Sequence, residues 1–200
     1  FSGGSDNVRY FVSGQYTSED GRYRTSSSEN KYNTNTTYER WNYRANVDMN
    51  LTRSTILKVS VGGWLVNRNS PQSDAYYTPL SSPRKWSTGQ WPVVNGMTTP
   101  EYQMTQTGYR TIWESKVESS VALDQDLSFI TKGLKFSGVF AFDTYNKNTI
   151  RRSKAQELWS AEYSRDANGN LVLKRVQNAA AMSQKKIVEG DKRYYLQASL

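Results

Sequence analysis

Oxygen-bearing side chains at alternate positions make the stretch from Asp166 to Asn170 a candidate for calcium binding. Asp166, Asn168 and Asn170 have the spacing with which a calcium loop of the EF-hand type begins. That loop also needs glycine at its sixth position and glutamate at its twelfth, where this chain has Leu171 and Gln177. Because Asp, Asn and Gly are also typical turn residues, the stretch predicts a hairpin turn rather than a metal site.

Catalytic chemistry has few other starting points in this chain. It contains no histidine and no cysteine, which removes the commonest general base, thiolate nucleophiles, disulfides and zinc fingers. Asp124 and Asp126 could form a carboxylate pair, but they read as solvated residues of a turn. The glycosylation sequons at Asn35 and Asn50 are matches that are frequent by chance. We therefore expect no enzymatic activity, no metal and no cofactor.

Aromatic side chains in polar segments are the better candidates for a binding role. Flat aromatic faces stack on sugar rings and also anchor protein partners. The alternative is that these rings pack the loops onto one another. The candidate substrate- or partner-binding residues are Tyr76, Tyr77, Trp86, Trp91, Tyr102 and Trp159.

The elements that would position these loops are long strands. From Trp41 to Leu51 apolar and polar residues alternate without an exception, with the apolar ones at odd positions. Strands of soluble proteins usually have about 5–6 residues, whereas eleven residues at about 3.3 Å each reach roughly 36 Å. Tilted by about 40°, such a strand would span roughly 28 Å, close to the apolar band of an outer-membrane barrel. The length therefore favours a membrane barrel over a soluble sandwich.

Further alternating stretches predict five complete strands and part of a sixth. All five prolines of the chain lie in one segment, from residue 68 to 108, which we expect to be a loop. The connections are expected to run long, short, long, fairly short and long, as in barrels with short turns on one side of the membrane and long loops on the other. A small hairpin is expected at 158–174, and no helix is predicted. The strands are expected at 8–17, 41–51, 55–67, 109–124, 134–146 and 192–200.

The net charge of +8 raises the possibility of nucleic-acid binding. The basic residues are scattered, with the densest cluster at 151–154, and no recognition helix or RNA-binding motif accompanies them. We therefore expect no nucleic-acid partner and assign the charge to solvated loops and a polar barrel interior. No apolar run approaches the length of a membrane helix, which a membrane barrel does not require.

Several motifs, in this order and spacing, resemble the barrel strands of SusC-like (SusC/RagA-type) TonB-dependent outer-membrane transporters. The stretch SGGSDNVRYFVSGQY at 2–16 resembles that family's strand with "GG" followed by "YFVS" and "Y". A strand with the pattern R-x-N-x-D follows, matched here by Arg44, Asn46 and Asp48. The segments NRNSP at 67–71 and LSFITKGLKF at 127–136 are also similar to family segments.

The resemblance implies an all-β fold, an antiparallel up-and-down transmembrane β-barrel with long extracellular loops. Residues 1–200 would then be part of a larger, 22-stranded barrel domain whose plug domain lies outside this chain. It further implies import of oligosaccharides or peptides across the outer membrane of a Bacteroidota-like Gram-negative bacterium. The partners implied are a SusD-like surface lipoprotein, the TonB complex acting through the plug, outer-membrane lipid, and a dimer of transporter–lipoprotein pairs.

On this interpretation the odd-numbered face of residues 41–51 meets lipid, and Arg44, Asn46 and Asp48 face the barrel lumen. Two alternatives remain open at the level of sequence. A non-importing outer-membrane barrel or adhesin would share every strand feature. A secreted carbohydrate-binding β-protein would share the aromatic residues.

Overall fold

A computed structural model describes residues 1–22, 32–73 and 84–200 of the chain. The described residues are almost entirely β-strand, with one short helix, so the predicted all-β class is confirmed. The elements are β1 Ser2–Gly4, β2 Val8–Asp20, β3 Thr37–Asn50, β4 Thr55–Pro71, β5 Trp91–Val94, β6 Met97–Thr98, α1 Pro100–Thr105, β7 Gly108–Asp126, β8 Lys135–Ala155, β9 Leu158–Arg165, β10 Leu171–Gln177 and β11 Ala180–Ser199.

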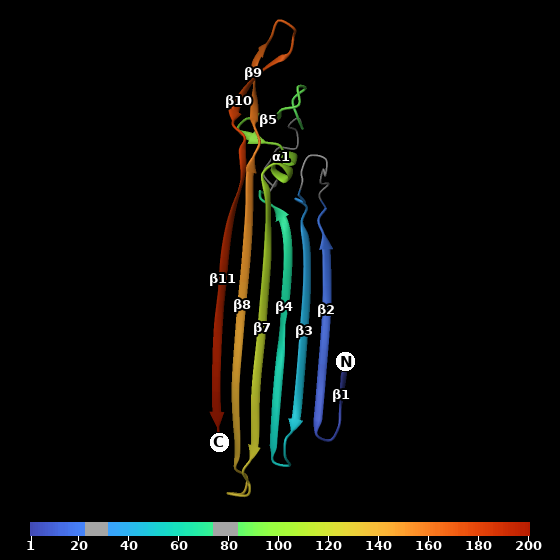
Figure 1. Cartoon of the computed structure of the whole chain (residues 1–200), viewed down its shortest axis with the longest axis vertical. Coiled ribbons are helices and arrows are strands. Elements are labelled where there is room, and N and C mark those ends of the chain that lie inside the picture. The colour runs from blue at the N-terminus through green and yellow to red at the C-terminus, as the bar shows by residue number, and fades with distance from the viewer. Residues whose placement is uncertain (23–31, 74–83) are drawn as a thin grey trace.

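The long strands form one antiparallel sheet, in which chain order and spatial order agree. The order is β1-β2-β3-β4-β7-β8-β11, so each long strand pairs with the next long strand along the chain. In Figure 1 these strands stand side by side, with tight turns at one end and larger loops at the other. The predicted meander and the predicted alternation of long and short connections are therefore confirmed.

The pairing of these strands is long and regular. β4 pairs with β7 without interruption from Thr55↔Gln125 to Pro71↔Tyr109, and β7 pairs with β8 from Gly108↔Ser153 to Asp126↔Lys135. Continuous register matters because a slip of one residue would move every side chain to the opposite face. The sheet is open: in the described residues β11 has no strand on its outer side, and β2 is covered there by the three residues of β1 alone.

Several boundaries differ from those expected. The sixth strand, β11, begins at Ala180 instead of 192, and β8 continues to Ala155, so much of the expected loop at 147–190 is strand. The sequence of these added residues is basic, alternates weakly and carries no local strand signal. They are extended because β8 and β11 pair with each other. β4 extends to Pro71, which sits at a strand end, where the missing N–H does not interrupt the ladder.

A second, smaller assembly lies above the loop end of the sheet, and we call it the loop module (residues 84–107 and 156–179). It contains the four-stranded sheet β10-β9-β5-β6 together with α1. β9 and β10 form the hairpin predicted at 158–174, with its turn at Asp166–Asn170. The cluster of buried hydrophobic residues lies here and consists of Trp91, Tyr102 and Leu158 with Val93 packed against it. Val66 and Ile112 are buried within the long sheet.

Local sequence explains the β5–β6 hairpin and α1, which were not predicted. Asn95 and Gly96 both have positive φ, and Asn-Gly is the strongest short signal for the tight turn that joins β5 to β6. Thr99 caps α1 by accepting a hydrogen bond from the backbone N–H of Tyr102, with Pro100 and Glu101 in the first turn. The expectation of no helix was therefore wrong, although these residues are typical of a helix start.

Candidate functional site: a two-faced sheet and the loop module

The long sheet has one apolar and one polar face, and the strand register aligns residues of the same kind across all its long strands. One cross-strand row of the apolar face is Tyr10–Val47–Val59–Val121–Phe140–Leu196. No row of the opposite face is comparably apolar. The alternation seen at Trp41–Leu51 is thus a property of the whole sheet.

The apolar face is uncovered in the described part of the chain. Trp41 and Trp113 expose 55% and 45% of their surface, and most members of the row named above are also exposed. The Tyr16 and Trp41 rings pack against each other at 4.4 Å between centroids, near the loop end of the strands. At the turn end, between β7 and β8, Phe129 and Ile130 are exposed as well. Such a contiguous apolar surface marks a contact with something apolar.

One glycine of this face allows an unusually close approach of neighbouring strands. A Cβ atom at Gly63 would overlap the backbone carbonyl of Lys116 on β7, and the Tyr43 hydroxyl lies 2.9 Å from the same position. Tyr43 is the cross-strand partner of Gly63, so its ring covers the place where a side chain is missing. Gly14, in the same row on β2, has no atom closer than 3.9 Å to its Cβ position.

The polar face carries paired charges and hydrogen bonds. The three residues predicted to face a barrel lumen, Arg44, Asn46 and Asp48, lie together on it. Ser60 donates to the Asn46 Oδ1 at 2.7 Å, and Asp48 lies 3.7 Å from Arg9. A hollow in this face is lined by Arg44, Asn46, Glu118, Asp143 and by small residues of β4 and β7.

Further ion pairs on the polar face join neighbouring strands. Lys58 of β4 binds Asp124 of β7 at 2.7 Å, and Ser137 donates to the same carboxylate. Lys147 of β8 binds Glu189 of β11 at 3.1 Å. Asp124 is therefore engaged in a strand-to-strand network, and not in a carboxylate pair with Asp126, which accepts hydrogen bonds from Ser128 instead.

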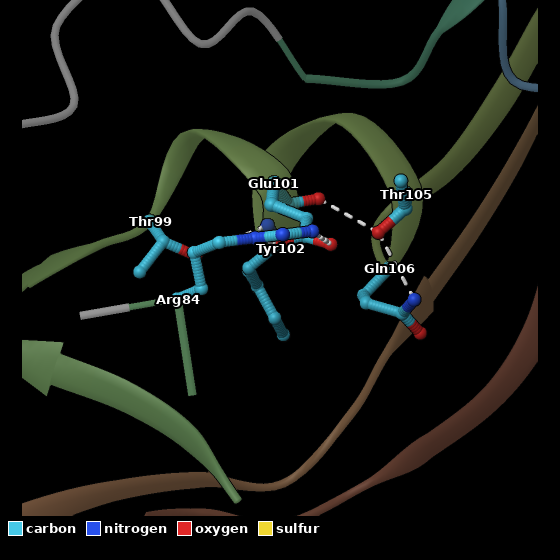
Figure 2. A network of polar contacts seen from close by, with 6 residues as sticks. All are labelled: Arg84, Thr99, Glu101, Tyr102, Thr105 and Gln106. Atoms are coloured by element: carbon cyan, nitrogen blue, oxygen red, sulfur yellow. Dashed lines mark hydrogen bonds and ion pairs between the residues drawn. The ribbon is translucent and has the colours of Figure 1, made fainter. Parts of the chain in front are cut away.

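The loop module is held by polar contacts around α1, which Figure 2 shows from close by. The Arg84 guanidinium donates to both Glu101 carboxylate oxygens at 2.6 Å, and this interaction lowers the pKa of Glu101 below its ordinary value. The hydroxyl of Tyr102 lies within hydrogen-bond distance of Gln156 at 3.3 Å and accepts from Gln177 at 3.0 Å. Tyr102 thus joins three segments that are distant in sequence.

The six aromatic residues predicted to bind a substrate or partner have different surroundings. Trp91 and Tyr102 expose only 9% and 3% of their surface, which favours the packing alternative for these two rings. Trp86 and Trp159 are partly exposed; the Trp86 indole N–H donates to the Trp159 carbonyl at 2.8 Å, and Arg175 lies over the Trp159 ring. Tyr76 and Tyr77 lie outside the described residues.

The Asp166 carboxylate is used by its own turn. It accepts hydrogen bonds from the backbone N–H groups of Asn168 and Asn170, and these bonds lower its pKa. This is the hairpin turn that the sequence predicts. No group of three or more acidic side chains in the described segments is placed to hold a metal ion.

Comparison with known proteins adds no identification. No protein-family model matches the chain, and no curated protein matches it. Within the described residues, no helix has the length and apolar character needed to cross a membrane.

Proposed function

We propose that this chain is part of the barrel of a TonB-dependent outer-membrane importer of oligosaccharides or peptides. The observation that carries the membrane part of the proposal is the uncovered apolar face of the long sheet, continuous from β2 to β11. A soluble sheet of this area would cover that face with a second sheet or with helices. Hydrocarbon is the partner that needs no polypeptide cover.

The height of the apolar band is close to that of a bilayer. On β2 the apolar face runs from Val8 to Tyr16, which is roughly 26 Å along the strand at about 3.3 Å per residue and roughly 20 Å in height at a tilt of about 40°. The apolar band of outer-membrane barrels is about 25 Å tall, with aromatic girdles at both edges. Trp41 and Trp113 would lie in the outer girdle, and Phe129 would lie at the inner one.

The upper edge of the band also crosses the strands obliquely. It ends at Tyr16 on β2 but at Tyr194 on β11, which lies in the cross-strand row of Val12. Four residues of shift over five strand spacings correspond to roughly 13 Å in roughly 24 Å, an inclination of about 30°. Barrel strands cross the membrane at about 35–45°, so a level membrane would produce a slope of this kind. Trp113 lies about two rows beyond this slope.

The importer part of the proposal is supported by the resemblance of the strand motifs to SusC-like transporters. On this proposal Arg44, Asn46 and Asp48 line the lumen, and the loop module lies at the cell surface. There it can shape the substrate cavity or contact a SusD-like lipoprotein. Energy would come from the TonB complex through a plug domain.

The membrane location is tested by one pair of neighbouring substitutions in the full-length protein. Val47→Arg places a charge in the middle of the apolar row and should reduce assembly, because a lipid-facing arginine costs about 2–4 kcal/mol. Asn46→Arg adds the same side chain on the opposite face and should assemble normally. The measurement is the amount of heat-modifiable barrel in outer membranes, and equal amounts for both variants would refute the assigned facing.

Import is tested separately from location. Deletion of the gene should abolish growth on a particular glycan or peptide source, and the intact gene should restore it. The protein could also assemble in the outer membrane while deletion of its gene leaves growth on every such source unchanged. That result would identify it as a non-importing barrel or adhesin.

A further inference from the structure

A row of like charges crosses three neighbouring strands at the loop end of the polar face. The register pairs Arg110 of β7 with Arg151 of β8, and Arg151 with Lys185 of β11. Ser70 of β4 continues the row and accepts a hydrogen bond from the Arg110 Nε at 2.7 Å. Arg68 lies on the same face, one row deeper. We call Arg110, Arg151 and Lys185 the cationic row.

Unlike several other cations of the polar face, the members of the cationic row form no ion pair with an acidic side chain of the described residues. Deeper in the sheet, Lys58 binds Asp124 and Lys147 binds Glu189. Arg151 and Lys185 are exposed and have no acidic partner within the described part of the chain. Like charges directly opposite each other on a sheet destabilise it. Stability of the sheet therefore does not explain why these three cations lie side by side.

The surrounding sequence strengthens this charge instead of balancing it. The strand ends at 67–71, 108–112, 150–155 and 180–188 contain no acidic residue. They contain seven of the 26 basic residues of the chain, namely Arg68, Arg110, Arg151, Arg152, Lys154, Lys185 and Lys186. Arg68, Arg110, Arg151 and Lys185 lie on the polar face, whereas Arg152 and Lys186 lie on the opposite face.

We propose that the cationic row binds the anionic groups of an acidic oligosaccharide at the mouth of the barrel. This inference rests on the proposed function and narrows its substrate class. Two of the three side chains are arginines, whose planar fork matches carboxylate and sulfate oxygens. Neighbouring cations of the row are one strand spacing apart, about 4.8 Å, which is close to the length of one unit in a linear sugar chain. In an extended acidic peptide, side chains on one face recur at about 6.7 Å, which fits the row less well.

The test measures binding to the full-length transporter, purified in detergent, with three probes of matched length. They are a linear oligogalacturonate, a neutral malto-oligosaccharide and an oligoglutamate peptide. We expect the oligogalacturonate to bind at least tenfold more tightly than the neutral probe and to weaken as salt is raised, because exposed charges are screened. The triple variant R110Q/R151Q/K185Q should lose this advantage.

A matched control removes the same charge from the other end of the sheet. Arg53, Lys132 and Lys135 lie in or beside the tight turns, so R53Q/K132Q/K135Q should bind all probes as the unmodified protein does. Since substitution of the cationic row removes repulsion, the triple variant should assemble as well as the unmodified protein, which heat-modifiability checks.

Equal binding of charged and neutral sugars, or unchanged binding by the triple variant, would overturn the inference and leave the importer proposal standing. Preference for oligoglutamate over oligogalacturonate would overturn it in favour of an acidic peptide. Failure of the full-length protein to assemble in the outer membrane would instead refute the proposed function.

Discussion

Several large aromatic residues are exposed in the long sheet, whereas others are buried in the loop module. In the loop module Trp91 and Tyr102 are buried and form a small core with Leu158. In the sheet Trp41, Trp113 and Tyr194 stand exposed on the apolar face. The module also satisfies its polar groups internally, through Arg84, Glu101 and the Tyr102 hydroxyl.

This difference in burial is what the proposed function predicts for a module in water and a sheet in lipid. A segment that folds in water gains stability by burying large apolar groups against its own chain. The loop module buries Trp91, Tyr102 and Leu158 in this way, while Tyr163 and Val176 stay exposed. A sheet that leaves a whole face of such groups uncovered gains nothing from that face in water. The contrast is what the proposed function predicts, with the module outside the membrane and the sheet within it.

The largest effect within the loop module is expected from removal of Tyr102. Tyr102→Ala should destabilise the module by about 3–5 kcal/mol, the usual cost of deleting a large buried ring. Tyr102→Phe keeps the packing and removes the hydroxyl that Gln156 and Gln177 contact, so it should cost about 1–3 kcal/mol. Protease susceptibility of residues 84–107 in membranes measures both. Equal resistance of the alanine variant would mean that the module has no core of its own.

A smaller effect is expected from a methyl group added to the sheet. Gly63→Ala should weaken the pairing of β4 with β7, because the new Cβ overlaps the Lys116 carbonyl; overpacking of this kind costs about 1–3 kcal/mol. Gly14→Ala, in the same row, meets no close atom and serves as the control. The readout is the temperature at which the heat-modifiable form is lost, and equal temperatures for both variants would contradict the close approach at Gly63.

The smallest effect concerns pH and again separates the two regions. The pKa of Glu101 is lowered mainly by its hydrogen bonds to Arg84, so the pair stabilises the module above the ordinary glutamate pKa of 4.5. This contribution is lost as the pH falls through the lower pKa of the folded state. The protection of α1 amides, corrected for the intrinsic pH dependence of exchange, should therefore fall below about pH 4.5, and E101Q should remove that fall. If E101Q had the same pH profile of α1 exchange as the unmodified protein, the Arg84–Glu101 pair would not be what stabilises the module.

Sequence pattern predicts the long sheet well because its information is local. Alternation in Trp41–Leu51 and its neighbours fixes both the strand and the side that each residue faces. The module was predicted less completely. Its β9–β10 hairpin was predicted because it has a local turn signal. The burial of Trp91 and Tyr102 was not, because it depends on contacts across more than fifty residues. The turn signal at Asn95-Gly96 and the cap at Thr99 were present but stood in a segment interpreted as loop from its prolines.

The cationic row shows why part of the site could not be found from sequence. Arg110, Arg151 and Lys185 are far apart along the chain, and Lys185 lies in a stretch without a strand pattern. They become neighbours only through the register of β7, β8 and β11. Along the sequence these basic residues are scattered, and only the pairing of the strands brings them into one row.

The most direct test of the central claim is a lipid-quenching scan through positions 44 to 49. Residues 1–200 contain no cysteine, so single cysteines can be introduced at each position and labelled with a fluorophore, with any cysteine elsewhere in the full-length protein replaced by serine. In vesicles of brominated lipid, labels at positions 45, 47 and 49 should be strongly quenched, and labels at 44, 46 and 48 should not. Quenching without this alternation, or quenching at the even positions, would contradict a sheet with lipid on its apolar face.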